Sequence, residues 1–258
     1  SLIAWYREHA RRLPWRDIDD PYVTLVSEVM LQQTQVDRVA PKFEHFIATW
    51  PTIESLAAAD QADVLEAWSG LGYNSRALRL IDAARIIAAS GWPTTATDLQ
   101  QLPGIGPYTS AAIASIAFGC NTPAIDTNIR RVLSRWTGVV LEGSALSEVA
   151  NSLVGQPAGD WNQAIMDLGA TICRPRNPAC DDCPVVDWCT DPTIYLAPPR
   201  QGAFKGSNRE LRGALVRAHI RGDDLWTTGR SLGRSDEEIA AALEMLAEEG
   251  LIVILRTT

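Results

Sequence analysis

The sequence predicts an all-α chain up to about residue 200, followed by a small α+β module. No segment before residue 200 shows a convincing alternation of apolar and polar residues, which is the pattern of a half-buried strand. Several segments instead space their apolar residues in a way that fits an amphipathic helix, as Leu78, Ile81, Ile86 and Ile87 do. Prolines and glycines then divide these segments with short connectors.

The expected helices follow one another closely. A first helix in residues 1–13 ends at Leu13-Pro14, because proline disfavours helical geometry in the residue before it. Pro21 stands near the start of a helix-rich segment that extends to about residue 50, with an interruption at Pro41. Further helices are expected in residues 52–56, 62–68 and 75–89, with stops at Gly70-Leu71-Gly72 and Gly91-Trp92-Pro93.

The C-terminal fifth of the chain is expected to be a separate unit. Residues 191–208 contain several prolines and glycines and predict a linker. In residues 209–258 we expect a helix over 209–220, a turn at Gly222, a helix over 236–249 and a strand over 251–255. This order is typical of a winged-helix-like module, and a docked helical tail is the alternative.

The composition of the chain argues against several classes of protein. No run of about 18 apolar residues occurs, so no membrane span is expected. No basic and apolar leader opens the chain, so we expect a cytoplasmic protein, not a secreted one. The net charge of −8 argues against a simple electrostatic binder of nucleic acid, but arginines gather in residues 7–16 and 130–135, while acids gather near the C-terminus.

Four of the five cysteines lie close together, with the spacing Cys173-x6-Cys180-x2-Cys183-x5-Cys189. Four thiolates within so short a segment can converge on one metal centre. Structural zinc more often uses two Cys-x2-Cys pairs, and here there is one, so a [4Fe–4S] cluster fits at least as well. Cys120 stands apart and is expected to be a small core residue.

Glu28 lies in an apolar segment, between Val26 and Val29-Met30-Leu31, and three glutamines follow within residues 32–35. A carboxyl group there is either a solvated glutamate or an acid held in a partly dry pocket. Burial would raise its pKa, because desolvation disfavours the charged form.

Two further segments could carry chemistry. Leu102-Pro103-Gly104-Ile105-Gly106 predicts a tight glycine turn before a helix, whose first amides could approach a phosphate; a plain interhelical turn is the alternative. Asp126 precedes another expected helix, where an N-cap worth ~1 kcal/mol is the alternative to a catalytic role.

Taken together and in this order, these segments resemble the helix-hairpin-helix DNA glycosylases of the endonuclease III superfamily. Residues 102–106 look like the hairpin, Asp126 like the essential aspartate, and the cysteines like the [4Fe–4S] loop. Within the superfamily, residues 27–36 are similar to MutY-type adenine DNA glycosylases. Residues 13–16, 70–73 and 161–170 add matches, so that the resemblance covers about residues 1–190.

The resemblance implies a fold and a division into domains. Residues 21–125 would form a six-helix barrel domain with the helix-hairpin-helix. Residues 1–20 and 126–190 would form the iron–sulfur domain. DNA would enter the cleft between them, with Glu28 and Asp126 on opposite walls.

The resemblance also implies a chemistry. Glu28 would be the general acid that protonates a purine leaving group, and Asp126 would stabilise the positive charge that develops on the sugar. Asn128 would orient Asp126 or the water. Tyr108 stands where relatives with a lyase step carry a lysine, so no strand cleavage is expected.

Other residues match DNA-contacting positions of the family. Gln33 and Tyr73 would enter the double helix, and Leu102, Gly104, Gly106 and Tyr108 would bind DNA from the hairpin. For each position an ordinary core or surface residue is the alternative. The wall of the base pocket would consist of Arg11, Trp15, Arg16, Leu31, Val36 and Gln163.

The chain also departs from the family pattern. Residues 200–258 are too short for the usual Nudix-like C-terminal domain, and Asn74 and Thr127 replace a common tyrosine and glycine. These departures leave the preference for the opposing base open.

We expect a monomeric, monofunctional glycosylase that removes adenine opposite 8-oxoguanine or guanine in double-stranded DNA. The alternatives are a mismatch uracil or thymine glycosylase, for which Glu28 is not needed, and a catalytically silent lesion binder.

Overall fold

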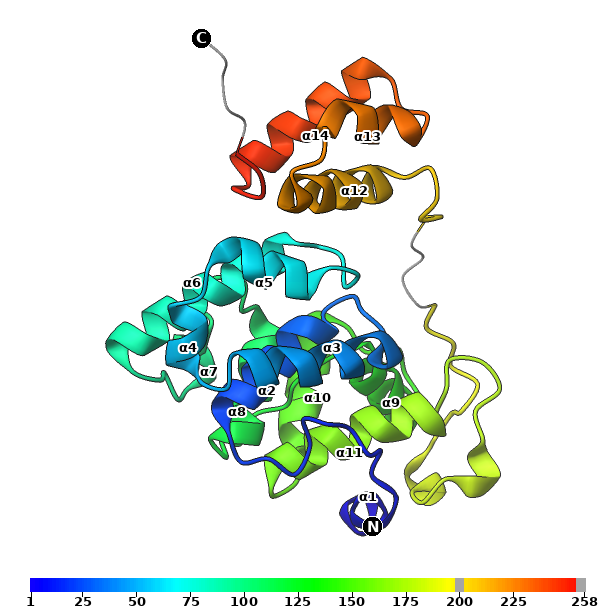
Figure 1. The fold of residues 1–258 in the computed structure, drawn as a ribbon. Helices are drawn as coiled ribbons and strands as arrows, with labels where there is room; N and C mark the ends of the chain where they lie inside the picture. The colour runs from blue at the N-terminus through cyan, green and yellow to red at the C-terminus, as the bar shows by residue number, and fades with distance from the viewer. Residues whose placement is uncertain (198–201, 254–258) are drawn as a thin grey trace. The chain divides into compact units, whose positions relative to one another are not determined.

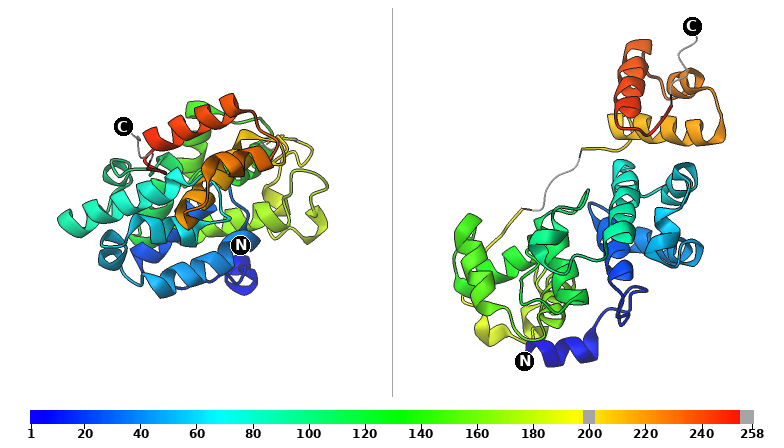
Figure 2. Two further views of the ribbon diagram at one scale, coloured as in Figure 1. Left: turned by 45° about the horizontal axis from the view of Figure 1, so that its top comes forward. Right: turned by 90° about the vertical axis from the view of Figure 1, so that its left-hand side faces the viewer.

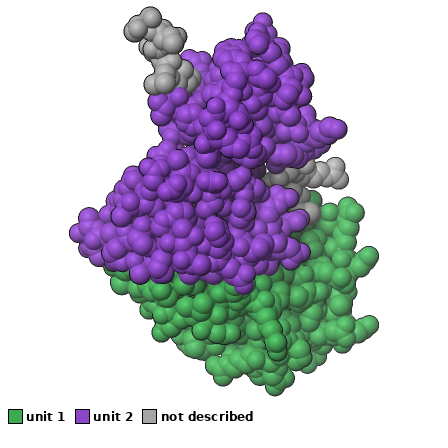
Figure 3. Space-filling view, in the orientation of Figure 1, with its two compact units in different colours: residues 1–28, 92–199 green, residues 29–91, 200–258 purple. Residues whose placement is uncertain are grey.

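The computed structural model describes residues 1–197 and 202–253, and these form helices and connectors without a strand (Figure 1). The all-α prediction for the chain up to residue 200 is confirmed over those residues. The chain divides into two compact units (Figure 3): unit 1 holds residues 1–28 and 92–199, and unit 2 holds residues 29–91 and 200–258. The domain boundaries expected at residues 20, 125 and 190 stay a prediction. Among the described helices, none is both long and apolar enough to cross a membrane.

Unit 1 is built around one central helix, α11, which packs against α1, α8 and α9 (Figure 2). The shared core contains Leu2 and Tyr6 of α1, Ile129 of α9, and Trp161 and Ile165 of α11. The helices of unit 1 are α1 (Leu2–His9), the first residues of α2 (Pro21–Leu31), α7 (Ala96–Leu99), α8 (Pro107–Ala117), α9 (Thr127–Thr137), α10 (Gly143–Leu153) and α11 (Ala158–Thr171).

Helices α9 and α11 approach each other closely at Gly169. A Cβ atom on Gly169 would lie 2.7 Å from the Cβ of Asn128, a distance that real Cβ atoms do not adopt. Glycine at this position therefore allows the N-terminal turn of α9 to lie directly against α11, which fixes the position of Asn128.

In its described residues, unit 2 contains the end of α2 and seven further helices. The helices α4 and α5 pack on α6, and α12 packs on α5. The bounds are α3 (Val36–Thr49), α4 (Ile53–Ala57), α5 (Gln61–Trp68), α6 (Ser75–Ser90), α12 (Asn208–Arg221), α13 (Leu225–Ser231) and α14 (Asp236–Glu248).

The interruption expected at Pro41 is wrong in position, because Pro41 lies inside α3. The break falls at residues 32–35 instead. There Gln33 adopts a left-handed φ of 58°, and the guanidinium of Arg76 binds the carbonyl oxygens of Val29, Met30 and Gln32 at the end of α2. Those carbonyls are thus satisfied by a side chain from α6, so that the helix ends there.

The C-terminal module differs from the expectation at two places. Helix α13 was not predicted, since its Thr227-Thr228-Gly229 run has low helix propensity. It is held by tertiary packing: a Cβ on Gly229 would lie 2.5 Å from the side chain of Ile239 in α14. The expected strand does not form at residues 251–253, where Leu251 and Ile252 adopt a bend, and its remaining residues lie outside the described part of the chain.

Candidate active site

Glu28 is a buried acid on α2, with 7% of its surface exposed among buried Val26, Val29 and Met30. The pKa of this carboxyl is raised to about 7, mainly because of burial and with a smaller contribution from the charge of Asp126. A hydrogen bond from Tyr108 and the charge of Arg16 act in the opposite direction. One carboxyl oxygen, Oε2, is buried without a hydrogen-bond partner in the described part of the chain. Glu28 is therefore the acid in a dry pocket, not a solvated glutamate.

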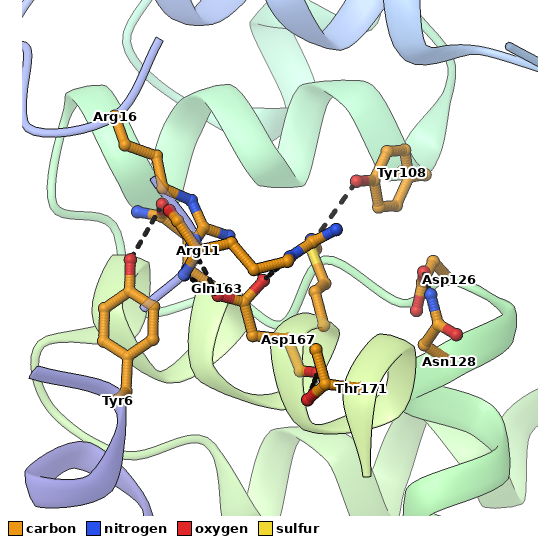
Figure 4. Close-up of polar contacts among 10 residues, drawn as sticks. Tyr6, Arg11, Arg16, Tyr108, Asp126, Asn128, Gln163, Asp167 and Thr171 are labelled. Carbon is orange, nitrogen blue, oxygen red and sulfur yellow. Dashed lines mark hydrogen bonds and ion pairs between the residues drawn. The ribbon is translucent and has the colours of Figure 1, made fainter. Parts of the chain in front are cut away.

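Tyr108 is placed by the glycine turn that the sequence predicted. Gly104 has a φ of +77°, which favours glycine, and Gly106 precedes α8 with Pro107 as its first residue. Burial raises the pKa of the Tyr108 phenol well above its usual range, so the phenol keeps its proton and donates. Its oxygen also lies 3.7 Å from the sulfur of Met166 (Figure 4).

Asp126 is the N-cap of α9 and uses both carboxyl oxygens. Oδ1 accepts the backbone N–H of Ile129 at 2.7 Å, and Oδ2 accepts the amide of Asn128 at 2.8 Å (Figure 4). Burial raises the pKa of Asp126, while these donors stabilise its charged form and lower the pKa. Arg131 in turn donates to Asn128 Oδ1 at 2.9 Å and to the Gly169 carbonyl at 2.7 Å, so that the amide orientation is fixed.

Asp167 is the centre of an ion-pair network that sequence reasoning did not single out. Its carboxylate is completely buried and accepts Arg11 Nε at 2.6 Å and two nitrogens of Arg16 at 2.5 and 2.7 Å (Figure 4). Arg11 and Arg16 were expected in the wall of the base pocket, and the structure ties both to α11. A carboxylate inside the apolar run Ile165-Met166-Asp167-Leu168 was the available signal, the same one that marked Glu28.

The other predicted pocket residues divide between the two units. In unit 1, Gln163 Oε1 accepts the hydroxyl of Tyr6 at 3.1 Å, and Trp15 is half-buried. Leu31 and Val36 are half-buried residues of unit 2 at the end of α2 and the start of α3. Their role as a base pocket stays a prediction.

Gln33 and Tyr73 lie in two loops of unit 2 that share one anchor. Both have left-handed φ values, 58° and 49°, which side-chain-bearing residues seldom adopt. The buried guanidinium of Arg76 donates to Gln32 O and Thr34 Oγ1 in the first loop and to Leu71 O and Gly72 O in the second. One side chain thus fixes the geometry of both loops.

The four cysteines of residues 173–189 surround a cavity of about 80 Å³. The cavity is otherwise lined by apolar groups and by Arg135, whose guanidinium donates to Cys173 Sγ at 3.1 Å. In the described residues no three such ligands come close enough to hold a single metal ion. Thiols that enclose a space suit a cluster, whereas zinc needs ligands that meet at one point. Cys120 lies apart and donates to the carbonyl of Thr94.

Two stretches of the chain match known protein families. Residues 26–152 match the HhH-GPD superfamily of base excision DNA repair proteins, and residues 173–189 match the iron–sulfur binding domain of endonuclease III. The predicted [4Fe–4S] cofactor is confirmed, and its ligands are expected to be Cys173, Cys180, Cys183 and Cys189.

Individual proteins with similar sequences are adenine DNA glycosylases. Adenine DNA glycosylase of Mycobacterium tuberculosis (strain ATCC 25618 / H37Rv) is 39% identical over 84% of this chain and 76% of that protein. The human adenine DNA glycosylase is 45% identical over 73% of this chain, but the chain spans only 38% of its length.

Solved structures show the same fold. A thermostable thymine-DNA glycosylase is 30% identical with a TM-score of 0.68, over 73% of this chain and 92% of that one. An endonuclease III–DNA complex, 19% identical with a TM-score of 0.61 over 74% and 92%, shows the fold alone.

The helical fold and the buried Glu28, together with the cysteine loop, define a DNA glycosylase of the HhH-GPD superfamily. Within this superfamily the chain belongs to the adenine DNA glycosylase family.

Proposed function

We propose that this chain hydrolyses the N-glycosidic bond of adenine mispaired with 8-oxoguanine or guanine in double-stranded DNA. It would act as a monomer, in the cytoplasm. The observation that carries the proposal is Glu28, a buried carboxyl group whose pKa of about 7 keeps about half of it protonated at neutral pH and whose Oε2 has no partner in the described part of the chain. An adenine ring nitrogen would supply that partner.

Glu28 acts as the general acid in this scheme. A purine leaves the sugar more readily once a ring nitrogen is protonated, and a donor with a pKa near the working pH is the most effective. The hydrogen bond from Tyr108 stabilises the carboxylate that remains after the proton has moved to the base. The proton ends on the departing adenine. Water supplies the hydroxyl group to the sugar, and its remaining proton returns to the Glu28 carboxylate.

Asp126 stabilises the positive charge that the sugar develops as the base departs. Its carboxylate is fixed by Ile129 N–H and by Asn128, so it need not reorganise during the reaction. A pair of carboxyl groups with different environments, one protonated and one ionised, is the recurring solution for glycosidic bonds.

A lyase step is not part of the proposed reaction. Schiff-base formation needs an amine nucleophile, and the chain has two lysines, Lys42 and Lys205. Both belong to unit 2, whereas Glu28, Tyr108 and Asp126 belong to unit 1.

The target base must leave the stack before Glu28 can reach it. We propose that Gln33 and Tyr73 enter the double helix there, and that the hairpin residues Leu102, Gly104 and Gly106 hold the backbone. The wall of the base pocket would consist of Arg11, Trp15, Arg16, Leu31, Val36 and Gln163. The cluster, when bound, cross-links the four cysteines and fixes the loop of residues 173–189.

The thymine-DNA glycosylase neighbour favours a second candidate, excision of thymine or uracil from mismatches. Glu28 separates the two functions. Release of a purine is assisted by protonation of a ring nitrogen, whereas release of uracil or thymine does not need it. A pyrimidine enzyme would therefore have no use for a buried acid with a pKa near 7.

The test uses four duplexes that hold A:8-oxoguanine, A:G, U:G or T:G, each treated with alkali after incubation. We expect cleavage of the two adenine duplexes only, with none before alkali and none with Glu28→Gln. Cleavage of the pyrimidine duplexes alone would overturn the adenine assignment. Cleavage without alkali would reveal a lyase step, and binding without cleavage would identify a silent lesion binder.

A further inference from the structure

A groove with a volume of about 1140 Å³ runs across unit 2, and none of the residues assigned to catalysis lines it. One side is formed by the loops of residues 33–38 and 69–75, and the other by helix α12. Helix α12 presents one face to it, since Arg209, Arg212, Val216 and Ile220 recur at helical spacing. The groove therefore joins the C-terminal module to the loops of Gln33 and Tyr73.

The groove is rich in cationic side chains, although the chain as a whole carries a net charge of −8. Arg38 from α3 and Arg217 from α12 line it, together with Arg209 and Arg212. A smaller hollow of about 600 Å³ shares Ser69, Arg217 and Ile220 and adds Lys42 and Arg221. Helical spacing of four residues places Arg38 beside Lys42 and Arg217 beside Arg221.

Acidic residues neutralise only part of this charge. Glu249 forms an ion pair with Arg212 at 2.7 Å, and Asp223 pairs with Arg221 at 2.8 Å. Asp63 and Glu66 line the smaller hollow. The side chains of Arg38 and Arg217, by contrast, are exposed and make no hydrogen bond or ion pair within residues 1–197 and 202–253. Their charges are available to an anion.

Two exposed aromatic rings also line the groove. Tyr73 is 43% exposed and Phe204 is 58% exposed, and the guanidinium of Arg76 lies over one face of the Tyr73 ring, 5.6 Å from its centre. A cationic groove with accessible aromatic rings is the combination that binds unstacked nucleic acid, because the phosphates meet arginine while the bases stack on the rings. An acidic polypeptide would use the charges but would have no use for the rings.

We propose that this groove binds an unstacked stretch of a DNA strand, with phosphates on Arg38 and Arg217 and a base against Phe204. The inference rests on the proposed function in one respect, since Tyr73 at the edge of the groove is also proposed to enter the double helix. It gives the C-terminal module a role as a DNA clamp, with α12 supplying half of the phosphate contacts.

The experiment measures the salt dependence of binding to a fluorescein-labelled duplex with an A:G mismatch. All proteins carry Glu28→Gln, so that no base is excised during the titration. The variant Arg38→Ala/Arg217→Ala is compared with Arg79→Ala/Arg85→Ala, which removes the same charge from a different hollow on α6. Each lost phosphate contact lowers the slope of log K against log salt by about 0.9.

For the groove variant we expect the slope of log K against log salt to be smaller by about 1.8. The ratio of parent affinity to variant affinity should therefore fall about 12-fold between 50 and 200 mM salt. The α6 variant should keep the parent slope. Equal slopes for the two variants would overturn the proposal, and would leave an acidic polypeptide as the better ligand for the groove.

A second measurement tests the stacking contact. Phe204→Ala should weaken binding of a duplex that contains an unpaired base by about fivefold or more, with the salt slope unchanged and binding of a fully paired duplex unaffected. An equal effect on both duplexes would overturn the assignment of Phe204. A protein with intact Glu28 that excises nothing, while these binding differences persist, would contradict the proposed function and leave the groove assignment standing.

Discussion

The phenol of Tyr108 donates a hydrogen bond to the carboxyl group of Glu28, and burial holds the proton of each group in place. The hydrogen bond favours the ionised form of Glu28, whereas its dry surroundings favour the neutral form, and the two influences leave its pKa at about 7. The contact between Tyr108 and Glu28 therefore influences the acid strength of Glu28 and stabilises the carboxylate that remains after proton transfer.

Tyr108→Phe should move the pH profile of excision upward. The general acid must be protonated, so the rate falls as pH rises through the Glu28 pKa. Loss of the hydrogen bond that lowers this pKa moves the fall to higher pH. Single-turnover excision rates between pH 5 and 9 would show the shift. The control is Tyr22→Phe, which changes a buried tyrosine on α2, the helix of Glu28, and should leave the profile unchanged. A shift to lower pH would contradict the assignment.

Glu28→Gln should make the protein more stable at high pH while abolishing excision. The folded protein binds the Glu28 proton more tightly than the unfolded chain does, since the pKa rises from 4.5 to about 7 on folding. That stabilisation is complete below pH 4.5 and is lost as pH rises through about 7, a change of about 3 kcal/mol. Urea unfolding at pH 5 and pH 8 should show the parent losing stability relative to the variant. A constant difference would mean that Glu28 titrates normally.

Asp167→Asn should destabilise the fold by about 3–5 kcal/mol, because it leaves the buried guanidinium of Arg16 without its partner. The pKa of Asp167 is lowered by its two arginines although burial opposes this, so the contribution is present at neutral pH and is lost as pH falls through the folded pKa. Asp160→Asn in the same helix is the control, since its ion pair with Arg7 is exposed and is worth about 1 kcal/mol or less. Similar unfolding free energies for both variants would exclude a structural role for the network.

Cys180→Ser should abolish iron binding, and Cys120→Ser should not. Cys180 lines the cavity shared by the four clustered cysteines, whereas Cys120 lies elsewhere and contacts Thr94. Iron content and the absorbance of the thiolate-to-iron charge-transfer band measure the cluster directly, and the melting temperature should fall with it. Stoichiometric zinc in the parent protein would contradict the cluster assignment.

Arg76→Lys should loosen both loops that carry Gln33 and Tyr73. The guanidinium donates to six acceptors, five carbonyls and the Thr34 hydroxyl, and an ammonium group has only three donors. We expect a loss of about 2 kcal/mol or more and faster proteolysis within residues 32–35 and 70–74. Arg79→Lys, an exposed neighbour on α6, should match the parent. Unchanged cleavage in the Arg76 variant would show that the loops hold their geometry without it.

The sequence by itself determined most of the local structure. Helical periodicity and the proline and glycine stops located the helices, and the Cys173–Cys189 spacing defined the cluster loop. The position of Glu28 in an apolar segment made a buried acid one of two alternatives, and the structure decides for it, because a carboxyl group with apolar neighbours on one helix face turns inward with them. These features depend on neighbours in sequence, and so the sequence contains them.

Tertiary structure decided what depends on distant residues. The tie of Arg16 to Asp167 joins residues 151 positions apart, and the end of α2 is set by Arg76 from α6. The low helix propensity of α13 is overridden by Gly229 packing on Ile239, and the groove lined by Arg38 and Arg217 exists only because α12 lies beside the loops of unit 2. Long-range ion pairs and packing have no local pattern, so only the folded chain reveals them.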